Sequence, residues 1–280
     1  MAELVGIFAA SHTPVMLNFP DAIADEQRNE IFAAFRSVGK RLREAKPDVL
    51  VIIADDHLHN FFLDNLPAFC VGAAESYATP IEHWLKAPKR ILRGSPQFST
   101  HLLEVAFNEG FDPALSMDLT LDHGALTPLE LSGLSDELAV VPLLINCVQP
   151  PLPTMARCLA WGKLLRKAID SYNPTQRVAI LATGGISHDI ATPRMGLVNE
   201  EFDRRFLELL EQGSEEELLK HSTEQVHTAG NGAEEIRNWL IAHGAANGTA
   251  AETIFYKPVE KWYTGIGLAS WGVEGSRHDA

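Results

Sequence analysis

The chain has 280 residues, of which 46% are hydrophobic and 21% charged, and its formal net charge is −14 at pH 7. This composition is ordinary for a globular enzyme, and the negative charge argues against nucleic acid or an anionic membrane surface as a partner. Three cysteines without paired spacing, an acidic rather than basic N-terminal segment and the lack of a bilayer-length apolar run favour a cytoplasmic protein with reduced thiols.

Segments with the patterns of strands and helices alternate along the chain. The expected strands are residues 4–10, 49–54, 68–72, 114–119, 138–147 and 177–183, with 255–257 and 266–271 as closing strands or loops. The expected helices are residues 21–45, 95–110, 154–172, 199–212, 214–221 and 233–242. The polar, proline-punctuated residues 75–94 are expected to form a surface excursion. Such alternation predicts an α/β fold with a central mixed sheet flanked by helices. No linker divides the chain, so residues 1–280 are expected to form a single domain.

Residues 50–63 carry the clearest sign of a functional site. An apolar run typical of a buried strand ends abruptly in Asp55, Asp56 and His57. Unpaired charge is costly in a protein core, whereas ligands of α/β proteins bind in the crevice at the carboxyl ends of the strands. The sequence therefore predicts an active site at this edge of the sheet.

Histidines follow several of the expected strands. His12, His57 and His188 each come just after a strand, and His123 follows a fourth candidate. Two imidazoles and one carboxylate with open positions are the facial arrangement typical of non-haem Fe(II). A further histidine outside the metal's coordination sphere would supply acid–base capacity, because its pKa lies near neutrality.

The candidate carboxylate lies at the start of the helix expected after Gly230. Glu234 and Glu235 are adjacent there, and neighbouring helical positions point about 100° apart, so only one of them should face the site. Glu235 is four residues before Trp239 and shares its face of the helix, which favours Glu235. Glu234 is then an acid favoured by the helix dipole.

These motifs together resemble the class III extradiol ring-cleaving dioxygenases, the family of the protocatechuate 4,5-dioxygenase catalytic subunit. The resemblance covers nearly the whole chain, and the order of the motifs makes it specific. The motifs are residues 11–14 (SHTP), 56–57 (DH) with 61–62 (FF), 122–124 (DHG), 183–188 (TGGISH), 193–197 (PRMGL) and 235–239 (EIRNW).

The resemblance implies a specific site and reaction. His12, His57 and Glu235 would bind Fe(II), and His123 and His188 would act as catalytic histidines. The reaction implied is extradiol cleavage of a catechol by O2. His59 lies two residues from a presumed ligand, so whether it contributes stays open. Asp122 is expected either to orient His123 or to serve only as a turn residue.

Substrate and partners are less determined by the sequence. Thr13 and Tyr263 are expected to lie against a substrate tail, and the motifs fit protocatechuate, gallate and dihydroxyphenylpropionate enzymes alike. We expect a homo-oligomer, and a small helical lid subunit of the protocatechuate type stays open. Two alternative functions are a zinc-dependent hydrolase or dioxygenase relative and a non-catalytic metal-binding member of the same fold.

Overall fold

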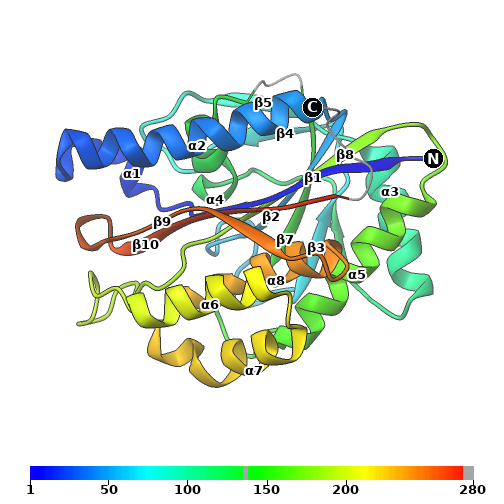
Figure 1. Cartoon of the computed structure of the whole chain (residues 1–280). Helices are drawn as coiled ribbons and strands as arrows, with labels where there is room; N and C mark the ends of the chain where they lie inside the picture. The colour runs from blue at the N-terminus through cyan, green and yellow to red at the C-terminus, as the bar shows by residue number, and fades with distance from the viewer. Residues whose placement is uncertain (135–137, 274–280) are drawn as a thin grey trace.

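A mixed sheet of eight strands forms the centre of the molecule, seen in a computed structural model that describes residues 1–134 and 138–273 (Figure 1). The strand order is β6-β3-β7-β2-β8-β1-β10-β9. The strands are β1 (Glu3–Ala10), β2 (Val49–Asp55), β3 (Phe69–Gly72), β6 (Ala114–Ser116), β7 (Ala139–Ile145), β8 (Arg177–Thr183), β9 (Ala251–Val259) and β10 (Thr264–Trp271). This architecture confirms the predicted α/β class with a central mixed sheet.

The centre of the sheet is parallel and its edges are mixed. Strands β7, β2, β8 and β1 run parallel to one another, while β10 is antiparallel to β1 and β3 is antiparallel to β7. The carboxyl ends of β1, β2 and β8 therefore meet at one edge of the sheet. The segments that follow these three strands carry three of the histidines predicted to be functional.

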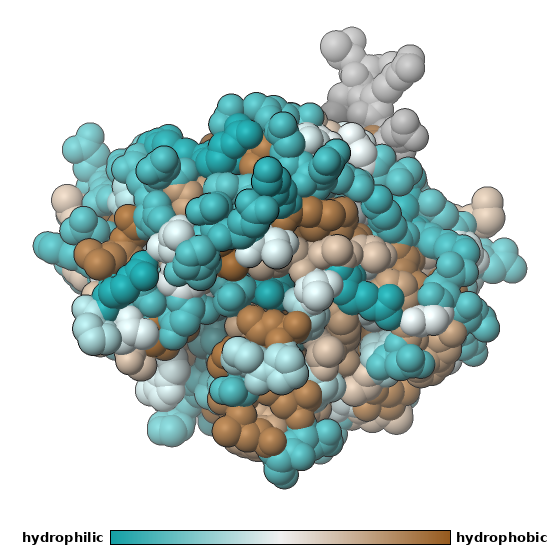
Figure 2. Space-filling model, turned by 90° about the horizontal axis from the view of Figure 1, so that it is seen from below, coloured by the Kyte–Doolittle hydropathy of each residue, from teal (hydrophilic) through white to brown (hydrophobic). Residues whose placement is uncertain are grey.

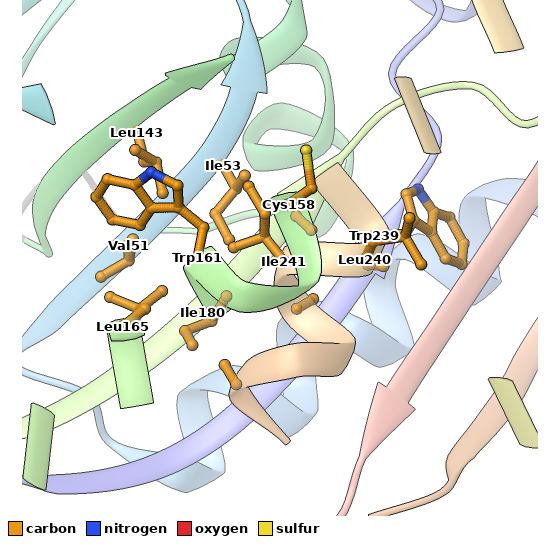
Figure 3. Packing of buried hydrophobic residues seen from close by; sticks show 14 of the residues in the cluster. Val51, Ile53, Leu143, Cys158, Trp161, Leu165, Ile180, Trp239, Leu240 and Ile241 are labelled. Atoms are coloured by element: carbon orange, nitrogen blue, oxygen red, sulfur yellow. The ribbon is translucent and has the colours of Figure 1, made fainter. Parts of the chain in front are cut away.

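Period-two alternation in the buried strands produces two separate apolar cores. In β2, Val51 and Ile53 belong to one core, whereas Leu50 and Ile52 belong to the other. The first core is covered by α3 (Pro96–Asn108), α5 (Met155–Ser171), α6 (Glu200–Gln212), α7 (Glu215–Gln225) and α8 (Ile236–Ala245), and the second by α2 (Asp25–Ala45) and α4 (His123–Ser132). Figure 3 shows side chains of β2, β7 and β8 packed with those of α5 and α8.

Four segments differ from the prediction. The expected surface excursion contains a small sheet of β4 (Ser76–Thr79) and β5 (Arg90–Arg93). Helix α4 was not expected, and its sequence contains Gly124 and Pro128, which weaken a helical pattern. The last helix is preceded by a 3₁₀ turn, η3 (Gly232–Glu235), and α1 (Val15–Asn18) is one short turn.

The covering helices α6 and α7 lie on the side of the molecule seen from below in Figure 2. That face is mostly hydrophilic, with separate hydrophobic patches among polar side chains. Among residues 1–134 and 138–273, no helix has both the length and the apolar character required to cross a membrane.

Candidate metal centre and active site

Four side chains converge at the carboxyl edge of the sheet. His12, Asp55, His57 and Glu235 each offer a ligand atom, and these atoms all lie within 4.8 Å of one another. His12 Nε2 is 3.2 Å from Glu235 Oε2, and His57 Nε2 is 3.5 Å from Glu235 Oε1. The structure thus brings together the three predicted ligands, which are distant in sequence, and adds Asp55 to them.

The second nitrogen of each imidazole is held by a neighbouring side chain. His12 Nδ1 lies 3.1 Å from Thr183 Oγ1, and His57 Nδ1 lies 2.8 Å from Asp122 Oδ2. Histidine ligands of metals usually donate the other ring N–H to such a group, which fixes the ring and its tautomer. Both rings therefore have Nε2 available for an ion, and the donor set of imidazoles and carboxylate suits a divalent transition metal.

A tight turn after β2 places His57. His57 and Leu58 have φ angles of 44° and 59°, a left-handed conformation that is uncommon for non-glycine residues. The Asp56 carboxylate stabilises the turn by accepting hydrogen bonds from the backbone N–H groups of residues 59–61. Asp56 is thus fully occupied in holding the loop, whereas the preceding Asp55 makes no such contacts.

Glu235 lies at the end of η3 and points inward, as the sequence predicted. The residue is 3% exposed, and its carboxylate accepts a hydrogen bond from the Gly185 backbone N–H at 2.6 Å. Glu234 instead forms an ion pair with Arg237. Burial would raise the pKa of Glu235, but His12 and His188 outweigh burial and hold it well below its usual range.

His188 is enclosed by two glycines. A Cβ at Gly185 would lie 2.3 Å from His188 Nδ1, and a Cβ at Gly232 would lie 2.1 Å from Nε2, so any larger residue would displace the ring. His188 Nε2 is 3.5 Å from Glu235 Oε1. Burial lowers the pKa of His188, but the charge of Glu235 outweighs burial and raises it above its ordinary value.

His123 is the first residue of α4 and is oriented by Glu82. Its Nδ1 lies 2.5 Å from Glu82 Oε1, and its backbone N–H donates to the same oxygen at 3.0 Å. Burial and the nearby His57 lower the pKa of His123 despite the carboxylate. Glu82 lies in the predicted surface excursion, where no periodic pattern pointed to it.

The expectation that Asp122 orients His123 is wrong. Asp122 holds His57, and its other carboxylate oxygen caps α4 by accepting from the Gly124 backbone N–H at 2.8 Å. The capping position directs its side chain back toward β2 rather than along the helix. His59 contacts Glu82 at 3.4 Å and stands outside the His12–Asp55–His57–Glu235 group.

A cavity of about 330 Å³ opens beside these groups. Both residues expected to contact a substrate tail, Thr13 and Tyr263, line it, as do His12, His57, His123, His188 and Glu235. Its remaining wall includes Trp84, Ile190, Met195 and Trp262. The cavity thus joins the convergent polar groups to a largely apolar chamber, which is the usual form of a small-molecule site.

Residues 6–267 match the family model described as the catalytic LigB subunit of aromatic ring-opening dioxygenase. The chain belongs to this family. The matched residues include the three predicted ligands and the two predicted catalytic histidines, from His12 to Glu235. The expectation of an extradiol, ring-cleaving dioxygenase is thereby confirmed.

Several relatives of this LigB-family chain are named 2,3-dihydroxyphenylpropionate/2,3-dihydroxicinnamic acid 1,2-dioxygenase. The relative from Burkholderia vietnamiensis is 29% identical, covering 92% of this chain and 94% of the relative. The relative from Photorhabdus laumondii is 27% identical, covering 95% and 96%. The crystal structure of the uncharacterized protein JW3007 from Escherichia coli K12 shares the fold, with a TM-score of 0.64, 16% identity, and coverage of 96% of this chain and 100% of that one.

Proposed function

We propose that this LigB-family chain is an Fe(II)-dependent extradiol dioxygenase in which His12, His57 and Glu235 bind the ion. The observation that carries the proposal is the arrangement of the two imidazoles. Each engages a neighbouring side chain through Nδ1, which leaves Nε2 3.2 Å and 3.5 Å from the Glu235 carboxylate. When bound, such an ion would lower the pKa of the catechol hydroxyls and would allow electrons to pass to O2.

His188 is proposed to accept a proton from a catechol hydroxyl. Its raised pKa arises from the Glu235 carboxylate, which outweighs burial. A divalent cation held by Glu235 opposes that negative charge, so loading the site lowers the pKa of His188. A neutral His188 ring near pH 7 is then able to act as a general base.

His123 is proposed to guide O2-derived groups or to return a proton during ring opening. The Glu82 carboxylate accepts from Nδ1, so Nε2 is the ring nitrogen left for chemistry. The lowered pKa of His123 keeps the ring neutral until it takes up a proton from the reacting groups. The pKa of His123 is thus lowered by burial and by His57, whereas that of His188 is raised by the charge of Glu235.

The cavity favours a catechol with an uncharged substituent. Among the described residues that line it, none is lysine or arginine, while Trp84, Ile190, Met195 and Trp262 are apolar or aromatic. The relatives named above act on a substrate with a carboxylate tail according to their names. Burial of such a tail without a cationic partner would be costly, so we propose an alkyl- or aryl-substituted catechol as the preferred substrate here.

Anaerobic loading with Fe²⁺, followed by O2 and a catechol panel, tests this function. We expect O2 uptake and a yellow ring-opened product, with kcat/KM at least tenfold higher for 3-alkylcatechols than for 2,3-dihydroxyphenylpropionate or protocatechuate. Loading with Zn²⁺ should give no O2 uptake, which separates the iron enzyme from the zinc alternative. Absence of turnover with every catechol in the Fe²⁺-loaded protein would contradict the proposal.

A covering partner is also proposed. Ile190, Met195, Leu197 and Tyr263 expose between 39% and 61% of their surface, and three of the four line the cavity. Side chains of this kind at a cavity mouth are typical of a surface buried by another chain. We therefore predict that this surface is covered in a homo-oligomer or by a small helical lid subunit. Light scattering of the purified protein tests the first of these, because it measures the molar mass of the assembly.

A further inference from the structure

Asp203 is a buried carboxylate to which the proposed chemistry gives no role. It lies near the start of α6 and is 0% exposed. The other buried residues of this helix are apolar: Phe202, Phe206, Leu207, Leu209 and Leu210. A carboxylate in such surroundings costs free energy unless hydrogen-bond donors of the protein satisfy it. The groups that donate to Asp203 therefore indicate what the residue holds in place.

Both oxygens of the Asp203 carboxylate accept hydrogen bonds from Ser187. Oδ1 accepts from the Ser187 backbone N–H at 2.9 Å, and Oδ2 accepts from the Ser187 hydroxyl at 2.8 Å. Oδ2 also accepts from the Tyr256 hydroxyl at 2.8 Å. Ser187 Oγ in turn accepts from the Asn199 backbone N–H at 2.9 Å, which fixes the direction of its own hydrogen. Asp203 thus holds Ser187 at two points, its backbone and its side chain.

Ser187 directly precedes His188, in the loop that follows β8. Each backbone N–H of residues 184–187 donates a hydrogen bond, and that of Ser187 is the one that ties the loop to α6. The His188 ring fits between Gly185 and Gly232 with no room for a further Cβ at either. A small shift of Ser187 therefore moves the ring relative to a bound substrate. A misplacement of about 1 Å can cost about 10²-fold in rate.

The same carboxylate lies against the β9–β10 hairpin, which forms part of the cavity wall. A Cβ at Gly265 would lie 2.0 Å from Asp203 Oδ2, so β10 approaches the carboxylate as closely as only glycine permits. The Gly265 backbone N–H donates to the Ser187 carbonyl oxygen at 3.1 Å. The two preceding residues, Tyr263 and Thr264, line the cavity. Asp203 therefore sets the loop that carries His188 and this wall of the cavity relative to each other.

We propose that Asp203 is a positioning residue of the reaction, which holds Ser187 and thereby fixes the His188 ring against the cavity wall. This inference rests on the proposed role of His188 as a proton acceptor and deepens it. Asp203 does not touch the substrate in this account and acts through His188 alone. Its loss should therefore slow the chemical step and spare binding of the substrate and of iron.

A double-mutant cycle on the full-length, Fe²⁺-loaded protein tests the proposal, with a 3-alkylcatechol as substrate. Burial raises the pKa of Asp203 to about 7, so the assays are run at pH 8, where the carboxylate is ionised. Asp203→Asn should lower kcat about 10- to 100-fold, change KM less than about threefold and leave bound iron at the wild-type level. In the His188→Phe background the same substitution should not lower kcat further, because the ring that Asp203 positions is gone. Glu208→Gln, an exposed carboxylate on the same helix, should leave kcat unchanged in both backgrounds.

Two further measurements complete the test. Tyr256→Phe removes one hydrogen bond and keeps the carboxylate, so it should fold and should lower kcat about 3- to 10-fold. NMR spectra of the histidine rings in the metal-free protein give a readout that is independent of turnover. The His188 signal, identified by its loss in His188→Phe, should shift in Asp203→Asn and stay in place in Glu208→Gln.

The outcomes separate this inference from the proposed function. If Asp203→Asn and Tyr256→Phe lower kcat by the same factor with and without His188, the carboxylate supports the fold in general and the positioning role is wrong. Wild-type kcat in both variants, or an unmoved His188 signal, also overturns the inference while the dioxygenase activity stands. A wild-type protein that takes up no O2 with any catechol overturns the proposed function, and this inference with it.

Discussion

A phenyl ring at position 188 would fill the space of the His188 ring while removing its nitrogens. Because the ring is enclosed by Gly185 and Gly232, His188→Phe should fold normally. We expect catechol-dependent O2 uptake to fall by about 10²- to 10⁴-fold, the range typical for loss of a general acid–base group. Bound iron, measured by elemental analysis, should stay at the wild-type level.

His227→Phe is the matched control for this prediction. His227 is exposed in the 3₁₀ turn η2 (Val226–Thr228), away from the cavity lining. Its substitution should leave kcat and iron content unchanged. Turnover in His188→Phe equal to that of this control would reject the proton-transfer role.

The sequence predicted the reacting side chains better than the groups that hold them. His12 and His57 stood out because each follows an apolar run typical of a buried strand. Glu235 stood out because it is an acidic residue at the start of an expected helix. Glu82 did not stand out, and Asp55 was noticed at the strand end but given no role, for two different physical reasons. Glu82 reaches His123 through tertiary packing of an irregular segment, and Asp55 lay beside two more conspicuous polar residues in the same motif.

At the scale of elements, the contact between α5 and α8 positions Glu235. A Cβ at Gly162 of α5 would lie 2.0 Å from the Ile241 carbonyl oxygen of α8. Side chains around this contact, including Cys158 and Trp161, fill the space between the two helices and the sheet (Figure 3). The helix that begins directly after Glu235 is therefore held by a backbone approach that only glycine permits.

Gly162→Ala should accordingly push α8 away from α5. We expect a loss of about 1–3 kcal/mol in the free energy of unfolding, the usual range for overpacking, together with weaker metal binding. Urea denaturation and chelator competition measure the two effects. Lys163→Ala, which removes only an exposed ion pair with Glu215, should cost about 0–1 kcal/mol and leave metal affinity unchanged. Equal results for both variants would contradict the argument.

Asp203 joins α6 to β9 and to the loop after β8, and its titration should change the free energy of unfolding with pH. From α6 it accepts hydrogen bonds from the Ser187 hydroxyl and from Tyr256 of β9, both at 2.8 Å. Burial raises the pKa of Asp203 to about 7, above its ordinary value, despite these hydrogen bonds. The native state therefore keeps a proton that the unfolded chain has already lost between about pH 4 and 7.

This difference in protonation makes the native state less stable as pH rises. The contribution of Asp203 is fully present below about pH 4 and is lost as the pH increases through about 7. Urea denaturation of the wild type and Asp203→Asn across this range isolates the effect, because other titrating groups cancel in the difference. A difference in stability that does not change between pH 4 and 8 would show that Asp203 keeps an ordinary pKa.

The sequence predicted regular elements well and irregular ones poorly. The strand at residues 177–183 has the same bounds in the structure, because its apolar run is complete and ends at a glycine pair. Helix α4 escaped notice since its ten residues include Gly124 and Pro128 and nearly all are buried, which removes the amphipathic period. Short edge elements such as β4 and β5 depend on their mutual pairing rather than on local pattern.

For the whole molecule, the arrangement of layers agrees with the alternating pattern of the sequence. Each central strand presents one set of side chains to α5 and α8 and the other to α2 and α4, so both faces of the sheet are covered. That residues 1–280 form one catalytic domain stays a prediction. The site lies at the carboxyl ends of β1, β2 and β8, in the middle of the sheet that both layers of helices cover. Uncompensated charge in the site therefore lowers the free energy of unfolding of the whole fold.

Removal of the metal should therefore destabilise the entire chain. Without an ion, the buried Asp55 and Glu235 carboxylates are left within 4.8 Å of the same ligand atoms, with only the imidazoles to balance them. An ion that binds the native state alone stabilises it by about 2.7 kcal/mol at a free concentration of 100 times Kd. Calorimetry with Mn²⁺ should show a melting temperature several degrees higher than with EDTA.

Glu235→Gln should lose most of this difference, whereas Asp48→Asn, just before β2 and exposed, should retain it. An equal melting temperature with and without saturating Mn²⁺ would mean that the ion does not bind the native state more tightly than the unfolded chain, which would contradict this prediction.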